Sequence, residues 1–162
     1  LVVKETPVTA DLIVGHVRKL GYFAEEHDLL DMDRTVLENM ASSAIDLNET
    51  EMRKVLGSFL FTGDDVHKPA GVLSGGEKTR LALATLVVSS ANVLLLDDPT
   101  NNLDPASRAQ VLDAIGNFGG AIVLVTHDEG AVHALDPDRV LVLPDGTEDM
   151  WSADYAELIS LA

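Results

Sequence analysis

Ser74, Gly75 and Gly76 are the first residues whose types and spacing point to chemistry. They stand directly before residues 77–88, a run of strong helix formers with apolar residues at helical spacing. The first N–H groups of a helix have no partner within it, and the helix dipole favours an anion there. Glycines let the backbone approach a ligand, and the Ser74 hydroxyl can cap the helix or bond a phosphate oxygen. For Ser-Gly-Gly alone, an ordinary capped helix is the preferred interpretation, and a phosphate site is the alternative.

Two carboxylates, Asp97 and Asp98, follow the continuous apolar run from Val93 to Leu96. Such a run is typical of a strand that is buried on both faces of a parallel sheet. Open α/β sheets bind ligands at the carboxyl ends of their strands, where both carboxylates would lie. Adjacent carboxylates repel each other unless a cation or a proton transfer uses them. A solvated turn explains a lone Asp-Asp pair, but poorly explains the whole string.

Four short motifs then occur in a fixed order. Residues 73–77 resemble the signature motif of the ATP-binding cassette (ABC) family, and residues 93–98 resemble its Walker B strand. Residues 100–104 resemble the D-loop, and Thr-His-Asp at 126–128, after an apolar strand, resembles the switch histidine. The resemblance implies an α/β fold: a partial P-loop NTPase domain of ABC type, with a parallel core sheet and an inserted α-helical subdomain.

Three further strings are similar to the ABC-F branch: Gly-Tyr-Phe-Ala at 21–24, Val-Leu-Glu-Asn-Met at 36–40 and Thr-Asn-Asn-Leu-Asp at 100–104. That likeness implies a soluble, cytoplasmic protein with two cassettes on one chain that acts on the ribosome; some such proteins confer antibiotic resistance. Two alternatives remain. One is the nucleotide-binding subunit of an ABC transporter, and the other is a slow or non-hydrolysing ATP-binding switch module.

The resemblance also implies site residues, with ATP and Mg²⁺ as cofactors and a second ABC cassette as partner. Two cassettes of this family close around two ATP molecules. The γ-phosphate of the partner's ATP would be bound by the signature motif, and Asp104 would communicate across the interface. The expected nucleotide-binding residues are Ser74, Gly75, Gly76, Glu77 and Asp104; the catalytic residues are Asp98, which orients the attacking water, and His127, which steadies the γ-phosphate; the metal-binding residues are Asp97 and Glu25.

Positions 25 and 98 depart from the family pattern. The family usually has glutamine where Glu25 stands and glutamate where Asp98 stands. Glu25 can still ligate magnesium, but it adds negative charge near the phosphate. Aspartate is one methylene shorter than glutamate, which withdraws its carboxylate by roughly 1 Å from a water it must reach at about 3 Å. We therefore predict ATP binding with slow hydrolysis.

A Walker A loop requires Gly, four residues and then Gly-Lys-Ser/Thr, and the sequence contains no such string. We therefore expect the chain to be the C-terminal part of one cassette, with its Walker A loop upstream of Leu1. Within it we expect a β-hairpin region (1–24), a helical subdomain (26–70), a core with signature helix, Walker B, D-loop and switch histidine (71–150), and a C-terminal helix (151–162).

Composition narrows the partners. The 162 residues include 27 acidic and 11 basic side chains, with a formal charge of −16 and no cysteine. Nucleic-acid affinity depends on Lys and Arg, so we expect no direct nucleic-acid binding by this segment, and any ribosome contact through regions outside it. No apolar run approaches the roughly 20 residues that span a bilayer, so we expect no membrane insertion.

Local patterns predict the remaining elements. Asn48 and Glu51 form a capping-box pattern before an apolar helical stripe, and Asp104 with Pro105 has the pattern of a helix start. The predicted elements are strands at 11–14 and 17–24 joined as a hairpin, a helix at 33–41, a loop at 62–70, a helix from 105 that stops at 119–120, a strand at 121–125, a short helix to 135, a hairpin of 139–143 with 147–151, and a helix at 154–161.

Overall fold

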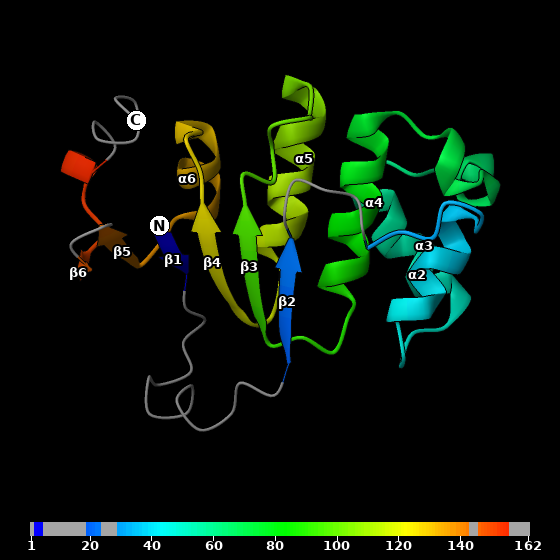
Figure 1. Ribbon diagram of the computed structural model, residues 1–162, viewed down its shortest axis with the longest axis horizontal. Helices are drawn as coiled ribbons and strands as arrows, with labels where there is room; N and C mark the ends of the chain where they lie inside the picture. The colour runs from blue at the N-terminus through cyan, green and yellow to red at the C-terminus, as the bar shows by residue number, and fades with distance from the viewer. Residues whose placement is uncertain (1, 5–18, 24–28, 143–145, 156–162) are drawn as a thin grey trace.

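The computed structural model describes residues 2–4, 19–23, 29–142 and 146–155 (Figure 1). Six strands form one sheet in the order β2-β3-β4-β1-β5-β6. β2, β3 and β4 are parallel, whereas β1 runs antiparallel to both β4 and β5, and β6 runs antiparallel to β5. The strands are β1 (Val2–Lys4), β2 (Leu20–Phe23), β3 (Val93–Asp97), β4 (Ala121–Val125), β5 (Arg139–Val142) and β6 (Thr147–Met150).

The parallel part of the sheet confirms the α/β prediction. β3 and β4 pair with Leu94 beside Ile122 and Leu96 beside Leu124, and all four side chains are buried in the main core cluster. Burial alternates along both strands, so Val93 and Leu95 are only half-buried. The prediction that β3 is buried on both faces is therefore wrong for the described residues. The buried side chains of α4 (Gly75–Val87) and α5 (Pro105–Gly116) belong to the same core cluster as Leu94 and Leu96, so both helices pack on the buried face of the sheet.

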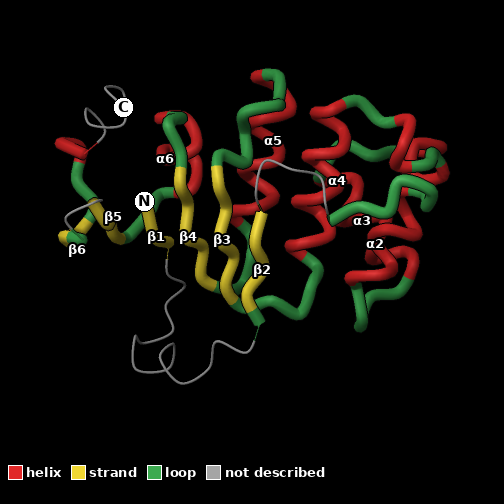
Figure 2. Tube along the Cα trace, viewed as in Figure 1, coloured by secondary structure: helices red, strands yellow, loops and turns green. Residues whose placement is uncertain are grey.

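A separate group of helices lies on the side of α4 away from the sheet (Figures 1 and 2). It consists of α2 (Val36–Ser43), α3 (Glu49–Ser58) and two short 3-10 helices, η1 (Gly63–His67) and η2 (Ala70–Val72). Arg80 of α4 ties this group to the signature helix, because its guanidinium donates to the carbonyl oxygens of Phe59 (3.1 Å) and Leu60 (3.3 Å) at the end of α3. One core cluster runs through both groups of elements.

Capping side chains set where these helices begin. Asn48 and Glu51 form the predicted capping box of α3, and Thr35 and Glu38 form an equivalent box on α2. Because Thr35 is the N-cap, α2 begins at Val36 and not at residue 33 as predicted. Each box satisfies backbone N–H groups that the first helical turn leaves without partners.

Gly119 and Gly120 do not end α5 as predicted. The helix ends at Gly116 with Asn117 as its C-cap. A Cβ at residue 120 would lie 2.4 Å from the carbonyl oxygen of Asn92, so Gly120 instead lets β4 begin against the start of β3. The predicted loop at 62–70 also differs, since η1 lies within it.

The C-terminal part of the described chain contains a short helix and a hairpin. The hairpin of β5 and β6 is confirmed, and α6 (Glu129–Leu135) is the short helix predicted up to residue 135. The partner of β2 within the described residues is β3, in parallel, while residues 5–18 of the predicted N-terminal hairpin and 156–162 of the predicted C-terminal helix lie outside the described residues. None of the described helices combines the length and hydrophobicity that a membrane span requires.

Candidate functional site

The carboxyl end of β3 carries the two predicted carboxylates, beside the end of β4. Asp97 is the last residue of β3, pairs with Val125 in the parallel register, and is half-buried. The chain turns sharply at Asp98, which has a left-handed φ of 40° and donates its N–H to the Val125 carbonyl oxygen at 2.9 Å. Non-glycine residues adopt this conformation rarely, although aspartate tolerates it better than most. The turn after β3 is thus held by a backbone bond to the neighbouring strand.

Asp98 and His127 meet at this edge of the sheet. One oxygen of the Asp98 carboxylate accepts the backbone N–H of His127 at 3.2 Å, and the other lies 3.9 Å from the imidazole Nε2. The Asp98 side chain is 22% exposed, whereas that of His127 is 64% exposed. The His127 imidazole is therefore accessible to a ligand, while the Asp98 carboxylate is held against the backbone of His127.

The tip of α4 confirms the helix start expected at Ser74. The Ser74 hydroxyl accepts the N–H of Glu77 at 3.3 Å and donates to the Glu77 carboxylate at 2.7 Å, and the Ser74 N–H donates to the same carboxylate at 2.8 Å. These bonds, the backbone one first, hold the pKa of Glu77 below its usual value. Ser74 is therefore the N-cap in a capping box with Glu77, and its exposed hydroxyl is already engaged by the Glu77 carboxylate.

The two glycines of the tip have different surroundings. A Cβ at Gly75 would meet no atom within 4 Å, so a ligand has room to approach that side of the residue. A Cβ at Gly76 would lie 2.7 Å from the carbonyl oxygen of Asn102, in the segment that follows β3. The prediction assigned both glycines to ligand approach, but the space at Gly76 is filled by this protein's own backbone. This contact also brings the tip of α4 against the loop that follows Asp97 and Asp98.

Asp104 is occupied by the start of its own helix. One carboxylate oxygen accepts the N–H groups of Ala106 and Ser107 at 3.1 Å, and the other accepts the Ser107 hydroxyl at 2.5 Å. These bonds, the hydroxyl one first, keep the pKa of Asp104 below its usual range. The predicted N-cap is confirmed, and a signalling role of Asp104 across an interface would compete with these bonds.

Three residues that the sequence reasoning left without a role join the loop to the switch segment. The carboxylate of Asp128 accepts the hydroxyl of buried Thr100 at 3.1 Å, pairs with Arg108 at 3.1 Å, and caps α6 through the N–H of Gly130 at 2.9 Å. An aspartate directly before a helix signals only the cap in the sequence, because the other two partners are distant in the chain. These three side chains, with Asn101, His127 and Glu129, line a hollow of about 400 Å³.

The Asp97 carboxylate fits a magnesium ion that is held mainly by water molecules. Within the described part of the chain, no group of three His, Cys, Asp or Glu side chains could hold a metal, and Glu25 lies outside that part. Among the described residues, no hydrogen bond or ion pair engages the half-buried carboxylate of Asp97. Magnesium prefers such oxygen ligands, keeps several waters, and takes one or two carboxylates beside substrate phosphates.

The structure therefore unites most of the predicted residues at one end of the sheet. Asp97, Asp98 and His127 share the edge formed by β3 and β4, and the tip of α4 contacts the adjoining loop through Gly76. A family model described as "ABC transporter" matches residues 2–101, more than half of the chain. The chain belongs to the ABC transporter family. The family predicted from the sequence is thereby confirmed.

Proteins named for ATP binding or as ABC transporter family members are similar over most of the chain. The "Putative ATP-binding protein YdiF" of Bacillus subtilis is 40% identical over 149 residues, which cover 92% of this chain and 23% of that protein. The "ABC transporter F family member 5" of Arabidopsis thaliana is 33% identical over 153 residues, which cover 93% of this chain and 22% of that protein. The chain thus spans about a quarter of the length of these relatives.

A solved ABC structure confirms the fold. The structure described as a dimeric post-hydrolysis state of the ATP-binding cassette MJ0796 bound to ADP and Pi matches with a TM-score of 0.67 at 19% identity. The match covers 91% of this chain and 69% of that chain.

Proposed function

We propose that this segment supplies half of two composite ATP sites in a cassette protein that hydrolyses ATP. The observation that carries the proposal is the bond between the Asp98 carboxylate and the His127 backbone, beside Asp97 and next to an exposed α4 tip. The sequence has no Gly-x4-Gly-Lys-Ser/Thr string to hold the other phosphates. The α4 tip and the sheet edge therefore need a second phosphate-binding element to complete each site.

Phosphoryl transfer needs positioning and neutralisation of spreading charge more than covalent chemistry. Gly75 leaves room at the N-terminus of α4 for the γ-phosphate of an ATP held by a facing cassette, and the Ser74 hydroxyl would turn from Glu77 to that phosphate. Asp97 would hold a magnesium ion through water. The ion would supply positive charge next to the phosphates. His127, exposed on the same edge, would donate to the γ-phosphate.

Asp98 would orient the attacking water, and its geometry favours slow hydrolysis. Its carboxylate is short and already accepts the His127 N–H. A misplacement of roughly 1 Å in an active site can lower the rate about a hundredfold. In single-turnover hydrolysis by the full-length protein, Asp98→Glu should therefore be faster than the wild type. Equal rates would remove this part of the proposal.

The full-length protein is proposed to be of ABC-F type, cytoplasmic, and to act in translation, including ribosome protection against antibiotics. The name of the Arabidopsis relative supports the F-type assignment. With a formal charge of −16, this segment is a poor ligand for RNA, so contact with the ribosome would be made by other regions. Sedimentation of the full-length protein with ribosomes in the presence of ATP tests this assignment. Co-purification with membrane subunits would instead favour a transporter subunit.

The test of ATP hydrolysis compares the full-length wild type with Asp97→Asn and His127→Ala. We expect phosphate release by the wild type, and loss of about 10²-fold or more in each variant, because each removes a group that stabilises developing charge. ATP binding without phosphate release in the wild type would identify a non-hydrolysing switch module instead.

A further inference from the structure

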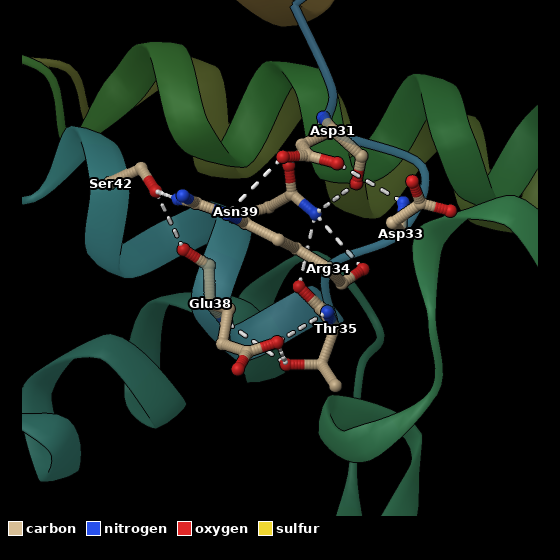
Figure 3. A network of polar contacts seen from close by, with 7 residues as sticks. All are labelled: Asp31, Asp33, Arg34, Thr35, Glu38, Asn39 and Ser42. Atoms are coloured by element: carbon tan, nitrogen blue, oxygen red, sulfur yellow. Dashed lines mark hydrogen bonds and ion pairs between the residues drawn. The ribbon is translucent and has the colours of Figure 1, made fainter.

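Asn39 is a buried amide at the centre of a polar network on α2 (Figure 3). It is only 5% exposed, and every polar atom of its side chain is used. The Nδ2 group donates to the carbonyl oxygens of Asp31 (2.9 Å), Thr35 (3.0 Å) and Arg34 (3.3 Å), while Oδ1 accepts the Asp31 N–H at 2.9 Å. One side chain therefore fixes the backbone of the whole 31–35 loop.

The same loop holds the segment that leads into the signature motif. The Arg34 carbonyl oxygen accepts the Ala70 N–H at 2.8 Å, and the Met32 carbonyl oxygen accepts the Gly71 N–H at 2.8 Å. The Val36 N–H donates to the Lys68 carbonyl oxygen at 3.0 Å. The 31–35 loop and residues 68–71 are thus joined by backbone bonds along their length.

Only residues 72 and 73 separate this joined segment from Ser74. Leu73 is buried, and its N–H donates to the Ala70 carbonyl oxygen at 3.2 Å. Gly71 lies close to the loop as well, since a Cβ there would be 3.0 Å from the Met32 carbonyl oxygen. The position of Ala70 and Gly71 therefore sets where the chain enters the α4 tip.

We propose that Asn39 is a positioning residue for the signature motif. By holding the 31–35 loop, it holds residues 68–71 and so places Ser74 and Gly75 for the γ-phosphate of the facing cassette. The inference rests on the proposed function of the α4 tip. Asn39 itself touches no nucleotide in this arrangement, so its action runs entirely through backbone bonds.

The chemistry of the amide makes the proposal specific. Asn39→Asp keeps the size and shape but replaces the donating NH₂ group with an oxygen that faces three carbonyl oxygens. Buried polar groups that lose their partners in such a network are costly, and the network has no spare donor among the described residues. Ser42→Ala is a matched control, because it removes exposed bonds of Ser42 to Glu38 and Arg34 and leaves every bond of Asn39 intact.

The test uses the full-length protein and measures ATP hydrolysis, affinity for a fluorescent ATP analogue, and amide hydrogen exchange. In Asn39→Asp we expect faster exchange across residues 69–77 and a kcat that falls roughly tenfold to a hundredfold, as for a misplaced reacting group. Nucleotide affinity should stay within about twofold of the wild type, because the phosphate cradle is on the facing cassette. Ser42→Ala should match the wild type in all three.

The double variant Asn39→Asp with Ser74→Ala separates positioning from general damage to the fold. If Asn39 acts through the tip, the double variant loses less kcat than the product of the two single losses; losses that multiply in full would overturn the proposal. A normal kcat in Asn39→Asp, or equal losses of kcat and nucleotide affinity, would overturn it too. If wild type and Ser74→Ala hydrolyse ATP equally, it is the proposed function of the tip that fails.

Discussion

Gly76→Ala tests the contact between the signature helix and the loop after β3, and Gly75→Ala is its matched control. An added Cβ at residue 76 lies 2.7 Å from the Asn102 carbonyl oxygen, whereas one at residue 75 meets nothing within 4 Å. Close carbon–oxygen contacts in proteins are about 3.3–3.6 Å, so one of the two backbones must move by roughly 0.6 Å or more. Neither glycine has a left-handed φ, so backbone conformation does not distinguish the two positions.

The expected cost follows from overpacking. Forcing an extra methyl group into a filled site costs about 1–3 kcal/mol, whereas glycine to alanine within a helix gains up to about 1 kcal/mol. Both variants receive a similar helix gain, so their difference isolates the contact with Asn102. We expect Gly76→Ala to be about 1–3 kcal/mol less stable than Gly75→Ala, which is roughly 2–10 °C in Tm for a domain of this size.

Thermal and urea unfolding of the two purified variants measure this difference, with unchanged urea m-values as the check that both unfold from a similar native state. Equal stabilities would refute the reasoning, because they would mean that the loop moves away from residue 76 at no cost. In that case the close approach of Gly76 to Asn102 would not hold the tip against the loop.

Further predictions follow from the other bonds of the site. Ser74→Ala should destabilise the protein by about 1 kcal/mol and Ser74→Gly by much less, because glycine is tolerated at an N-cap. If both variants of the full-length protein lose ATP hydrolysis to the same extent, the loss is due to the missing hydroxyl and not to the lower stability. Hydrogen bonds from Ser74 lower the pKa of Glu77. The wild type should therefore be more stable than Glu77→Gln above the usual pKa of a glutamate, and this advantage should disappear as the pH falls through the lowered pKa. Measuring the Tm of both proteins as a function of acidic pH checks the sign. Thr100→Val keeps the buried shape but removes a bond to Asp128, and should cost about 1–3 kcal/mol in urea unfolding, with no change counting against the network. The isolated 162-residue chain should show no appreciable ATP affinity by calorimetry, since it has no phosphate-cradle string; micromolar binding would contradict this.

Local patterns account for most of what the sequence predicts correctly. The helix starts at Ser74, Asn48 and Asp104 depend on side chains within three residues of the cap, so spacing alone reveals them. The apolar runs before Asp97 and before His127 likewise predict two strands, which the structure pairs side by side. For such features, neighbours in the chain are also neighbours in space.

Contacts between distant segments are what the sequence could not predict. The Asn92 carbonyl oxygen leaves no room for a side chain at Gly120, and the residues around position 120 do not indicate this contact. The pairing of Asp128 with Thr100 and Arg108 joins three separate elements. The half-buried state of Leu95 depends on which face the helices cover, whereas an apolar run looks the same for one covered face or two.

The bonds of Arg80 to the end of α3 affect how the helical group could transmit force. The Arg80 guanidinium donates hydrogen bonds to the carbonyl oxygens of Phe59 and Leu60, and its central carbon lies 5.1 Å from the centre of the Phe61 ring. These contacts join the end of α3 directly to the middle of α4, without passing through the intervening residues 61–74. The position of the α3 end is thus coupled through one side chain to the helix that begins at Ser74 and Gly75, so a change in the helical group would be passed to the signature motif.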